Sequence, residues 1–372
     1  MSWEKHLFRW AYEVTAAFAQ FDASFRSQHY PPTFLVPIKG YVMQVTNGRR
    51  SRAGFTRVDL VVTAGLSFTA FLLVIPSVLA SRQDAAREKC RDNLRTLGQG
   101  FLQFETANGG FPARRAGFNN GSPYGGWGSQ VLPFIGKPEL SNAYNSKLDF
   151  FDPANKAVTE THVDTFLCPA APGNHTVEIQ SQATAKSLNP DKDTVFTAKA
   201  GAVDYISSNG TLLPRGGYAM NQNDLDQGVG NQRQPLTDND YTPLTKISDG
   251  MSSTLLLIEQ AGRPDVWRLD KKKEGAGQFG MSPNARGSWA GWGSIAFGPA
   301  SATTGESPGK GDATDCTVNC NNWFGIYGFH EGGAHVLFCD GSVRFVGTGL
   351  DPLTFLYLTN CNDGHVVSQD DF

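Results

Sequence analysis

The chain has 372 residues, with 32 basic and 35 acidic side chains and a formal net charge of −3 at pH 7. A hydrophobic fraction of 40% excludes a mainly disordered chain, and the length provides enough material for a sizeable core. The near-neutral charge gives no support for nucleic-acid binding, which needs a strongly basic face. With 41 glycines and 20 prolines, the sequence predicts many turns and long loops.

The charge is distributed unevenly along the chain. Residues 1–54 carry seven Lys or Arg and three Asp or Glu, a net charge of +4, so the rest of the chain carries −7. A basic beginning followed by an acidic body is typical of a protein that crosses a membrane once. We therefore treat residues 1–54 as a cytoplasmic leader or extension.

Residues 60–80 are the strongest candidate for a membrane span. They form an apolar run of 21 residues without a charged side chain, and a helix of that length extends about 31 Å, close to the hydrocarbon thickness of a bilayer. Arg49, Arg50, Arg52 and Arg57 precede the run. Because positive residues stay on the cytoplasmic side, the N-terminus is expected inside and the body outside the inner membrane.

Two other interpretations of this run remain open. A buried core helix is one, although core helices seldom continue so long without a charge. A secretory signal peptide is the other, since Val78-Leu79-Ala80 resembles a signal-peptidase site with cleavage after Ala80. The run exceeds the usual 7–15 apolar residues of a signal peptide, which favours an anchored protein.

The residues just before the run have an informative order: Gly54, Phe55, three further residues, and then the acidic Asp59. This order resembles the prepilin-type N-terminal cleavage and methylation motif of type IV pilins and type II secretion pseudopilins. The resemblance implies that a prepilin peptidase and methyltransferase cuts between Gly54 and Phe55 and methylates the new amine. It also implies that Asp59 pairs with that amine of a neighbouring pilin-like subunit, because opposite charges that are each costly in lipid attract strongly.

Three features depart from the pilin pattern. Asp59 is one methylene shorter than the family's Glu, and Arg57 stands where the family prefers an apolar residue. A leader of 54 residues is also long for this family. A start at Met43 would shorten the leader to twelve residues, and the sequence leaves both starts open.

A helical repeat continues beyond the apolar run. Five residues at spacings of four, three, four and three form an apolar stripe: Cys90, Leu94, Leu97, Phe101 and Phe104. Gly109-Gly110 predicts the end of this helix. We expect one long helix over residues 55–108, with its first half in the membrane and its second half packed on the body.

Residues 109–372 are expected to form an extracytoplasmic α+β domain with an antiparallel sheet and long Gly- and Asn-rich loops. Short apolar runs predict strands at residues 165–168, 202–207, 254–260 and 334–346. Asp340-Gly341 predicts a two-residue hairpin turn that pairs Cys339 with Ser342 and Phe338 with Val343.

The spacing of His330, nine residues, and then Asp340-Gly341 resembles a C-terminal signature that accompanies prepilin motifs in a large bacterial family of unknown function. Other matching positions lie along the chain: Cys90 with Asn93-Leu94, Phe166 to Pro169, Asp204-Tyr205, Ile247 to Gly250, and Glu259. The resemblance covers residues 53–372. It implies a type IV pilin-like fold and no established enzymatic activity.

Six cysteines allow fifteen disulfide connectivities. Cys316 and Cys320 are four residues apart and can close a small loop, and Cys90 can meet Cys168. Both pairings are hypotheses, because cysteine spacing alone does not fix connectivity.

Four residues are the candidate metal ligands: His330, His335, Asp340 and His365. A turn Asp usually bonds its own backbone, and a lone His more often makes a structural contact, so we expect no metal, no cofactor and no catalytic residue. The main hypothesis is a non-enzymatic pilin- or pseudopilin-like surface protein that assembles into a pilus or secretion pseudopilus. The alternative is a monomeric membrane-anchored module that binds polysaccharide or another envelope component.

Overall fold

The computed structural model describes residues 56–118, 122–180, 197–211, 233–273, 287–291, 293–306 and 315–368. Residue contacts divide the chain into one unit over 1–65 and a second over 66–372. Met43, Gly54 and Phe55 lie outside the described residues. The start of the chain and the cleavage site therefore stay predictions.

In the first unit, the described residues begin with a capping box. The Thr56 main-chain N–H donates to Asp59 Oδ2 at 2.9 Å, and the Asp59 main-chain N–H donates to the Thr56 hydroxyl at 3.2 Å. Each side chain thus satisfies a main-chain donor that the first turn of a helix leaves free. Asp59 consequently fixes where the helix that follows begins.

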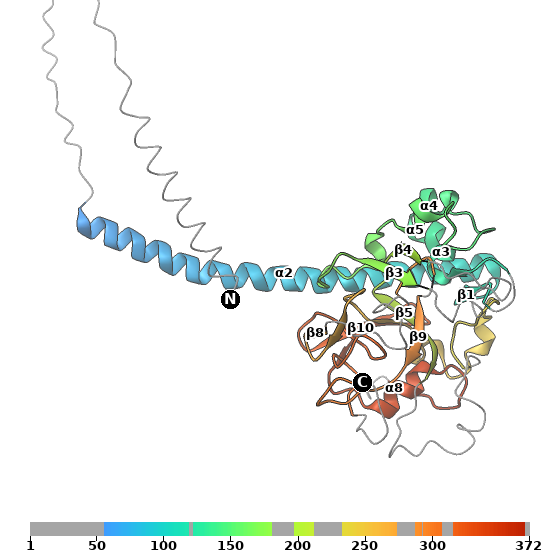
Figure 1. The fold of residues 1–372 in the computed structure, drawn as a ribbon. Helices are drawn as coiled ribbons and strands as arrows, with labels where there is room; N and C mark the ends of the chain where they lie inside the picture. The colour runs from blue at the N-terminus through green and yellow to red at the C-terminus, as the bar shows by residue number, and fades with distance from the viewer. Residues whose placement is uncertain are drawn as a thin grey trace, which may run out of the picture. The chain divides into compact units, whose positions relative to one another are not determined.

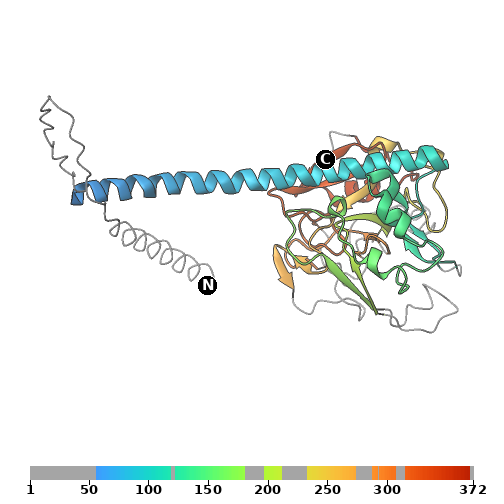
Figure 2. The ribbon, with the colours of Figure 1, turned by 90° about the horizontal axis from the view of Figure 1, so that it is seen from above.

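This helix, α2, spans Arg57–Asn108. It ends where Gly109 adopts a left-handed φ of 80° and donates its N–H to the carbonyl oxygen of Glu105. Within the second unit, its last turns run along the body of the domain (Figure 1, Figure 2). The predicted stripe from Cys90 to Phe104 faces the core and is buried.

No helix in the described part of the chain combines the length and the hydropathy that a membrane crossing requires. The span predicted for residues 60–80 is not confirmed and stays a prediction.

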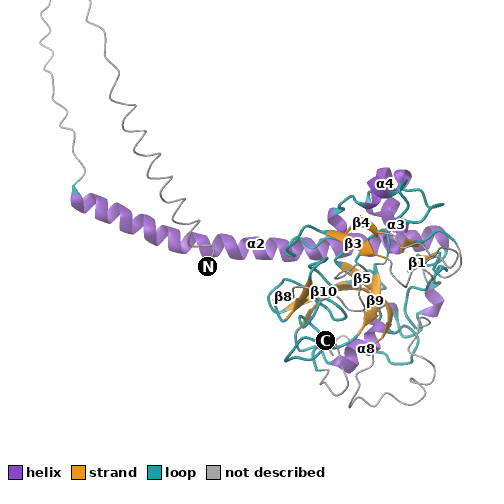
Figure 3. Ribbon diagram, in the orientation of Figure 1, coloured by secondary structure: helices purple, strands orange, loops and turns teal. Residues whose placement is uncertain are grey.

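The second unit is an α+β domain, and its described residues form one main sheet and three small two-stranded sheets between long loops (Figure 3). The main sheet has the order β11 (Val343–Gly347), β10 (Gly333–Phe338), β6 (Leu255–Glu259), β5 (Tyr205–Thr211) and β9 (Ser294–Phe297). Its neighbours are antiparallel except for β5 and β9, which are parallel. The small sheets pair β1 (Arg115–Ala116) with β2 (Gly125–Gly126), β3 (Thr176–Gln180) with β4 (Thr197–Gly201), and β7 (Val266–Arg268) with β8 (Lys271–Lys273).

The other helices in the described residues are short. The α-helices among them are α3 (Trp127–Val131), α4 (Pro138–Ala143), α5 (Lys156–Thr159) and α8 (Pro352–Thr359). The 3₁₀ helices are η1 (Leu132–Ile135), η2 (Asp164–Phe166), η3 (Leu244–Lys246) and η4 (Met251–Ser253). The α+β class is therefore confirmed.

The strand predicted at residues 165–168 is wrong. Residues 164–166 form η2, and side chains satisfy the backbone groups that follow. The Asn93 side chain donates to the Leu167 carbonyl oxygen at 2.8 Å, and the Cys168 N–H donates to Asp204 Oδ2 at 2.9 Å. These main-chain groups need no neighbouring strand, because side chains already satisfy their hydrogen bonds.

The predicted hairpin exists, but its register differs by one residue. Leu337 faces Val343, and the N–H of Phe338 donates to the Ser342 carbonyl oxygen. The turn therefore holds three residues, and its last residue, Gly341, has a left-handed φ of 84°, as three-residue hairpin loops require. Two-residue and three-residue loops share the Asp-Gly signal, so the sequence did not separate them.

Candidate functional site

The site begins at the end of strand β6, where an apolar run terminates in a fully buried acid, Glu259. A buried carboxylate is costly unless it is paired. His330 Nε2 lies 3.0 Å from Glu259 Oε1, and the main-chain N–H of His335 donates to Glu259 Oε2 at 2.9 Å. Burial alone would raise the pKa of Glu259, but the two histidines outweigh it and lower that pKa.

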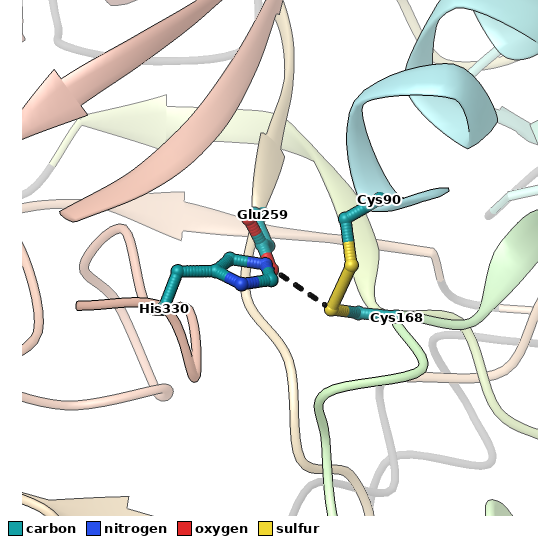
Figure 4. A group of neighbouring side chains, drawn as sticks. All are labelled: Cys90, Cys168, Glu259 and His330. Atoms are coloured by element: carbon teal, nitrogen blue, oxygen red, sulfur yellow. Dashed lines mark hydrogen bonds and ion pairs between the residues drawn. A yellow bond between two sulfur atoms is a disulfide. The ribbon is translucent and has the colours of Figure 1, made fainter. Parts of the chain in front are cut away.

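A disulfide lies directly beside this pair. Cys90 of α2 is bonded to Cys168, which sits in the loop after η2, and His330 Nε2 is 3.4 Å from Cys168 Sγ. Figure 4 shows the four side chains pointing toward one another from a helix, a strand and two loops. Each of Cys90, Cys168, Glu259 and His330 is buried and offers one ligand-type atom, and these atoms lie within 4.8 Å of one another.

Main-chain contacts fix the disulfide from both sides. The Tyr205 hydroxyl donates to the Cys90 carbonyl oxygen at 3.4 Å. Asp204 accepts from the N–H of Cys168 at 2.9 Å and from the N–H of Gly262 at 3.1 Å. The segment that carries Cys168 is therefore held in place independently of the covalent bond.

Asp204 itself is fully buried. Burial raises its pKa to about 7, and the nearby Glu259 adds to that rise, although the two main-chain N–H donors and Arg263 oppose it. The site thus combines one acid whose pKa is lowered with a second whose pKa is raised to about 7. Because Asp204 accepts the N–H of Cys168, its protonation affects a hydrogen bond to the main chain of Cys168.

The geometry does not match a thiol nucleophile relay. In such a relay one imidazole nitrogen contacts the sulfur while the acid binds the other. Here His330 turns the same atom, Nε2, toward both Cys168 Sγ and Glu259 Oε1. The arrangement instead places two sulfurs, one nitrogen and one carboxylate oxygen around a common centre.

Other residues singled out from the sequence lie elsewhere. Asp340 accepts the N–H of Ser342 at 2.8 Å within its own turn. His365 stacks on Tyr357 at a ring-centroid distance of 4.0 Å, and its Nδ1 lies 3.3 Å from Asp363 Oδ1. Within the described residues, the converging ligand group contains His330 but neither Asp340 nor His365.

Gly341 and the cysteine pair Cys316–Cys320 support the fold and do not belong to the buried cluster. A Cβ on Gly98 of α2 would lie 3.2 Å from the Cα of Gly341, so the hairpin turn packs closely against the helix. Cys316 is bonded to Cys320 and closes a small loop. The structure joins the same two cysteine pairs that the sequence offered.

The two acids, Glu259 and Asp204, were not predictable from the sequence as members of one site. Glu259 ends a strand whose five residues are all buried, and Asp204 directly precedes strand β5. An acid at the edge of an apolar run is a signal of a buried partner. Nothing in the linear order indicates that these partners are His330 and the Cys168 segment.

A family model described as "Protein of unknown function (DUF1559)", SBP_bac_10, matches residues 80–353. The chain belongs to this family. The DUF1559 match contains every residue of the buried cluster, from Cys90 to His330, whereas Gly54, Phe55 and Asp59 precede it. Comparison with curated proteins and with solved structures found no match.

Proposed function

We propose that this DUF1559 protein is a non-enzymatic pilin- or pseudopilin-like surface protein. A prepilin peptidase cuts it between Gly54 and Phe55, residues 60–80 anchor it in the inner membrane, and the domain after α2 lies outside. The observation that carries the proposal is the contrast along α2, in which one stretch packs on its own domain and another exposes apolar side chains.

The exposed stretch supports a role in lipid or in a filament core. Val61, Leu66 and Phe68 are 69%, 67% and 64% exposed. A row of exposed large apolar side chains on one helix favours an apolar partner, either lipid or the equivalent helix of another subunit. The helix of a pilin contacts lipid before assembly and the helices of other subunits in the filament.

The position of Asp59 also supports the proposal. Its carboxylate already accepts hydrogen bonds from the main-chain N–H and the hydroxyl of Thr56 at 2.9 and 2.8 Å. Cleavage after Gly54 would place a new amine on Phe55, one residue before Thr56. The carboxylate therefore stays at the first turn of α2, where an amine from a neighbouring subunit can reach it.

The test is mass spectrometry of the mature N-terminus from cells that carry the peptidase and from cells that lack it. We expect Phe55 with one added methyl group only when the peptidase is present. Gly54→Leu should block cleavage. Asp59→Ala should be cleaved normally but fail to enter sheared filaments, whereas the matched control Asp84→Ala, an exposed acid farther along α2, should assemble.

Three outcomes would contradict the proposal in different ways. A mature end at Ser81 would identify a signal-peptidase product and remove the filament function. An intact Met1 or Met43 would leave an uncleaved anchored protein and favour the binding-module alternative. Normal assembly of Asp59→Ala would remove Asp59 from the assembly step while leaving processing intact.

A further inference from the structure

We propose that Cys90, Cys168, Glu259 and His330 bind a zinc ion when the protein is reduced, so that the disulfide and the metal site are two states of one buried cluster. This inference does not depend on the proposed pilin function. It concerns the DUF1559 domain itself and a ligand set in which two members come from sequence positions 78 residues apart.

The donor types fit zinc. Structural zinc sites take four ligands from cysteine sulfur, histidine nitrogen and carboxylate oxygen, at bond lengths of about 2.0–2.3 Å. In a tetrahedral site those bonds place neighbouring ligand atoms about 3.3–3.7 Å apart. In this protein, His330 Nε2 is 3.0 Å from Glu259 Oε1 and 3.4 Å from Cys168 Sγ, and all four ligand atoms lie within 4.8 Å of one another. Reduction would let the two sulfurs separate to a similar distance.

One ligand atom has an incomplete set of partners. Glu259 Oε1 is completely buried and lies 3.0 Å from His330 Nε2, but it makes no hydrogen bond of good geometry with the described residues. Its sister atom Oε2 receives the His335 main-chain N–H. A carboxylate whose one oxygen is held while the other faces a nitrogen and two sulfurs is arranged as a metal ligand is.

The surroundings provide the support that metal ligands usually have. The Tyr205 hydroxyl holds the backbone of Cys90, and Asp204 holds the backbone of Cys168. His335 fixes Glu259 through Oε2. These contacts position the ligands without occupying the sulfur, nitrogen or oxygen atoms that would bind the metal.

A surface pocket lies close to the cluster, although none of the four ligand residues lines it. It is lined by residues of α2 and of the β10–β11 hairpin, among them Arg91 and His335. Arg91 follows Cys90 in sequence, and His335 contacts Glu259.

The redox step balances with a dithiol as reductant. The dithiol transfers two electrons and two protons to the Cys90–Cys168 bond, which becomes two thiols while the reductant becomes a disulfide. Zinc binding then displaces those two protons to solvent, because thiolates are the ligands. A small-molecule disulfide that accepts the two electrons is cleaved to two thiolates, while the Cys90–Cys168 bond re-forms and the ion is released.

The test uses the full chain in detergent, reduced with a phosphine under anaerobic conditions and titrated with Co²⁺ and then Zn²⁺. We expect one Co²⁺ per chain, with near-ultraviolet thiolate-to-cobalt absorption and the strong visible bands of tetrahedral cobalt. Zn²⁺ should displace the cobalt and protect Cys90 and Cys168 from alkylation, as peptide mass spectrometry would show. The oxidised protein, in which Cys90 and Cys168 are bonded to each other, should bind no Co²⁺.

Variants identify the ligands. Cys168→Ser should abolish the thiolate-to-cobalt absorption, and His330→Gln and Glu259→Gln should each weaken Co²⁺ binding by roughly a hundredfold. The matched controls are the double variant Cys316→Ser/Cys320→Ser, which lacks the other disulfide, and His365→Gln. Both controls should bind as the wild-type protein does.

The proposal fails if the reduced wild-type protein keeps its near-ultraviolet circular dichroism and takes up no Co²⁺. It also fails if the Cys316/Cys320 variant loses the signal, or if Zn²⁺ leaves Cys90 and Cys168 open to alkylation. The alkylation measurement uses only the wild-type chain, so a variant that does not fold leaves the test intact.

Discussion

Two stretches of α2 have similar apolar side chains and opposite surroundings. Val58, Val61, Leu66 and Phe68 are each more than half exposed, whereas the stripe from Cys90 to Phe104 is buried. The buried stripe recurs at helical spacing between charged residues, but residues 60–80 are apolar on every side. A stripe fits one surface of its own domain, while an all-round apolar helix needs an apolar medium or several neighbours.

The two stretches also differ in what holds them. The buried stretch is fixed by apolar packing, by the Cys90–Cys168 disulfide and by hydrogen bonds from Asn93 to Leu167 and from Tyr205 to Cys90. The exposed stretch begins with the Thr56–Asp59 capping box, which sets where the helix starts and involves no distant segment. Substitutions in the two stretches should therefore have different consequences.

The largest expected difference is between two phenylalanines. Phe101→Ala should lower the free energy of unfolding of the second unit by about 3–5 kcal/mol, because Phe101 is fully buried and contacts the rings of Phe111 and Trp127. Phe68→Ala should leave that free energy within about 0.5 kcal/mol of the wild-type value. Urea unfolding followed by tryptophan fluorescence measures both.

Two other results for Phe68→Ala would change this comparison of the buried and exposed stretches. If Phe68→Ala destabilises the domain as much as Phe101→Ala does, the two stretches share one set of supporting contacts. If Phe68→Ala instead weakens flotation of the protein with lipid vesicles while stability is unchanged, the exposed stretch acts through the membrane.

The next-largest expected effect is a change of stability with pH. It arises at Asp204, which holds the Cys168 segment that is bonded to the buried stretch of α2. Because burial raises the pKa of Asp204 to about 7, its protonated form favours the folded state. That contribution is complete below about pH 4 and is lost as the pH rises toward 7. Over pH 4.5 to 7, the loss from this group is on the order of 3 kcal/mol.

The measurement is urea unfolding of the wild-type protein and of Asp204→Asn across this range. The difference between the two free energies should change with pH in the stated direction, since Asn does not titrate. Glu259 has a lowered pKa, so its contribution is lost only as the pH falls below its ordinary range. Parallel curves for the two proteins would show that Asp204 is not the titrating group.

The smallest expected effect compares two glycines of α2. A Cβ at Gly98 would lie 2.9 Å from Leu337 Cδ1 and 3.2 Å from the Cα of Gly341, whereas a Cβ at Gly65 would meet nothing within 4 Å. Gly98→Ala should destabilise the domain by about 1–2 kcal/mol, because overpacking exceeds the gain in helix propensity. Gly65→Ala should be neutral or slightly stabilising.

Thermal or urea unfolding of both variants measures the two changes in stability. A stabilised Gly98→Ala variant would mean that the hairpin turn moves away from α2 at little cost. In that case the left-handed Gly341 would be required by the turn alone and not by the approach of the helix.

Several elements were predictable because their signals are local. The end of α2 at Asn108 follows from Gly109, and the buried face follows from spacings of three and four. The β10–β11 hairpin follows from Asp340-Gly341 between apolar runs. Its register did not follow, because two-residue and three-residue hairpin loops share the Asp-Gly signal.

The sequence by itself determined the α+β class, the long helix with its buried stripe and the existence of the hairpin. These features depend on periodicity, turn chemistry and composition within short windows. Only the tertiary structure decided that Glu259, His330 and the Cys90–Cys168 pair share one buried centre, and that Asp204 holds the Cys168 segment. The physical reason is that a buried acid requires a partner but does not specify it; the partner is whichever group the packed elements bring within hydrogen-bond distance.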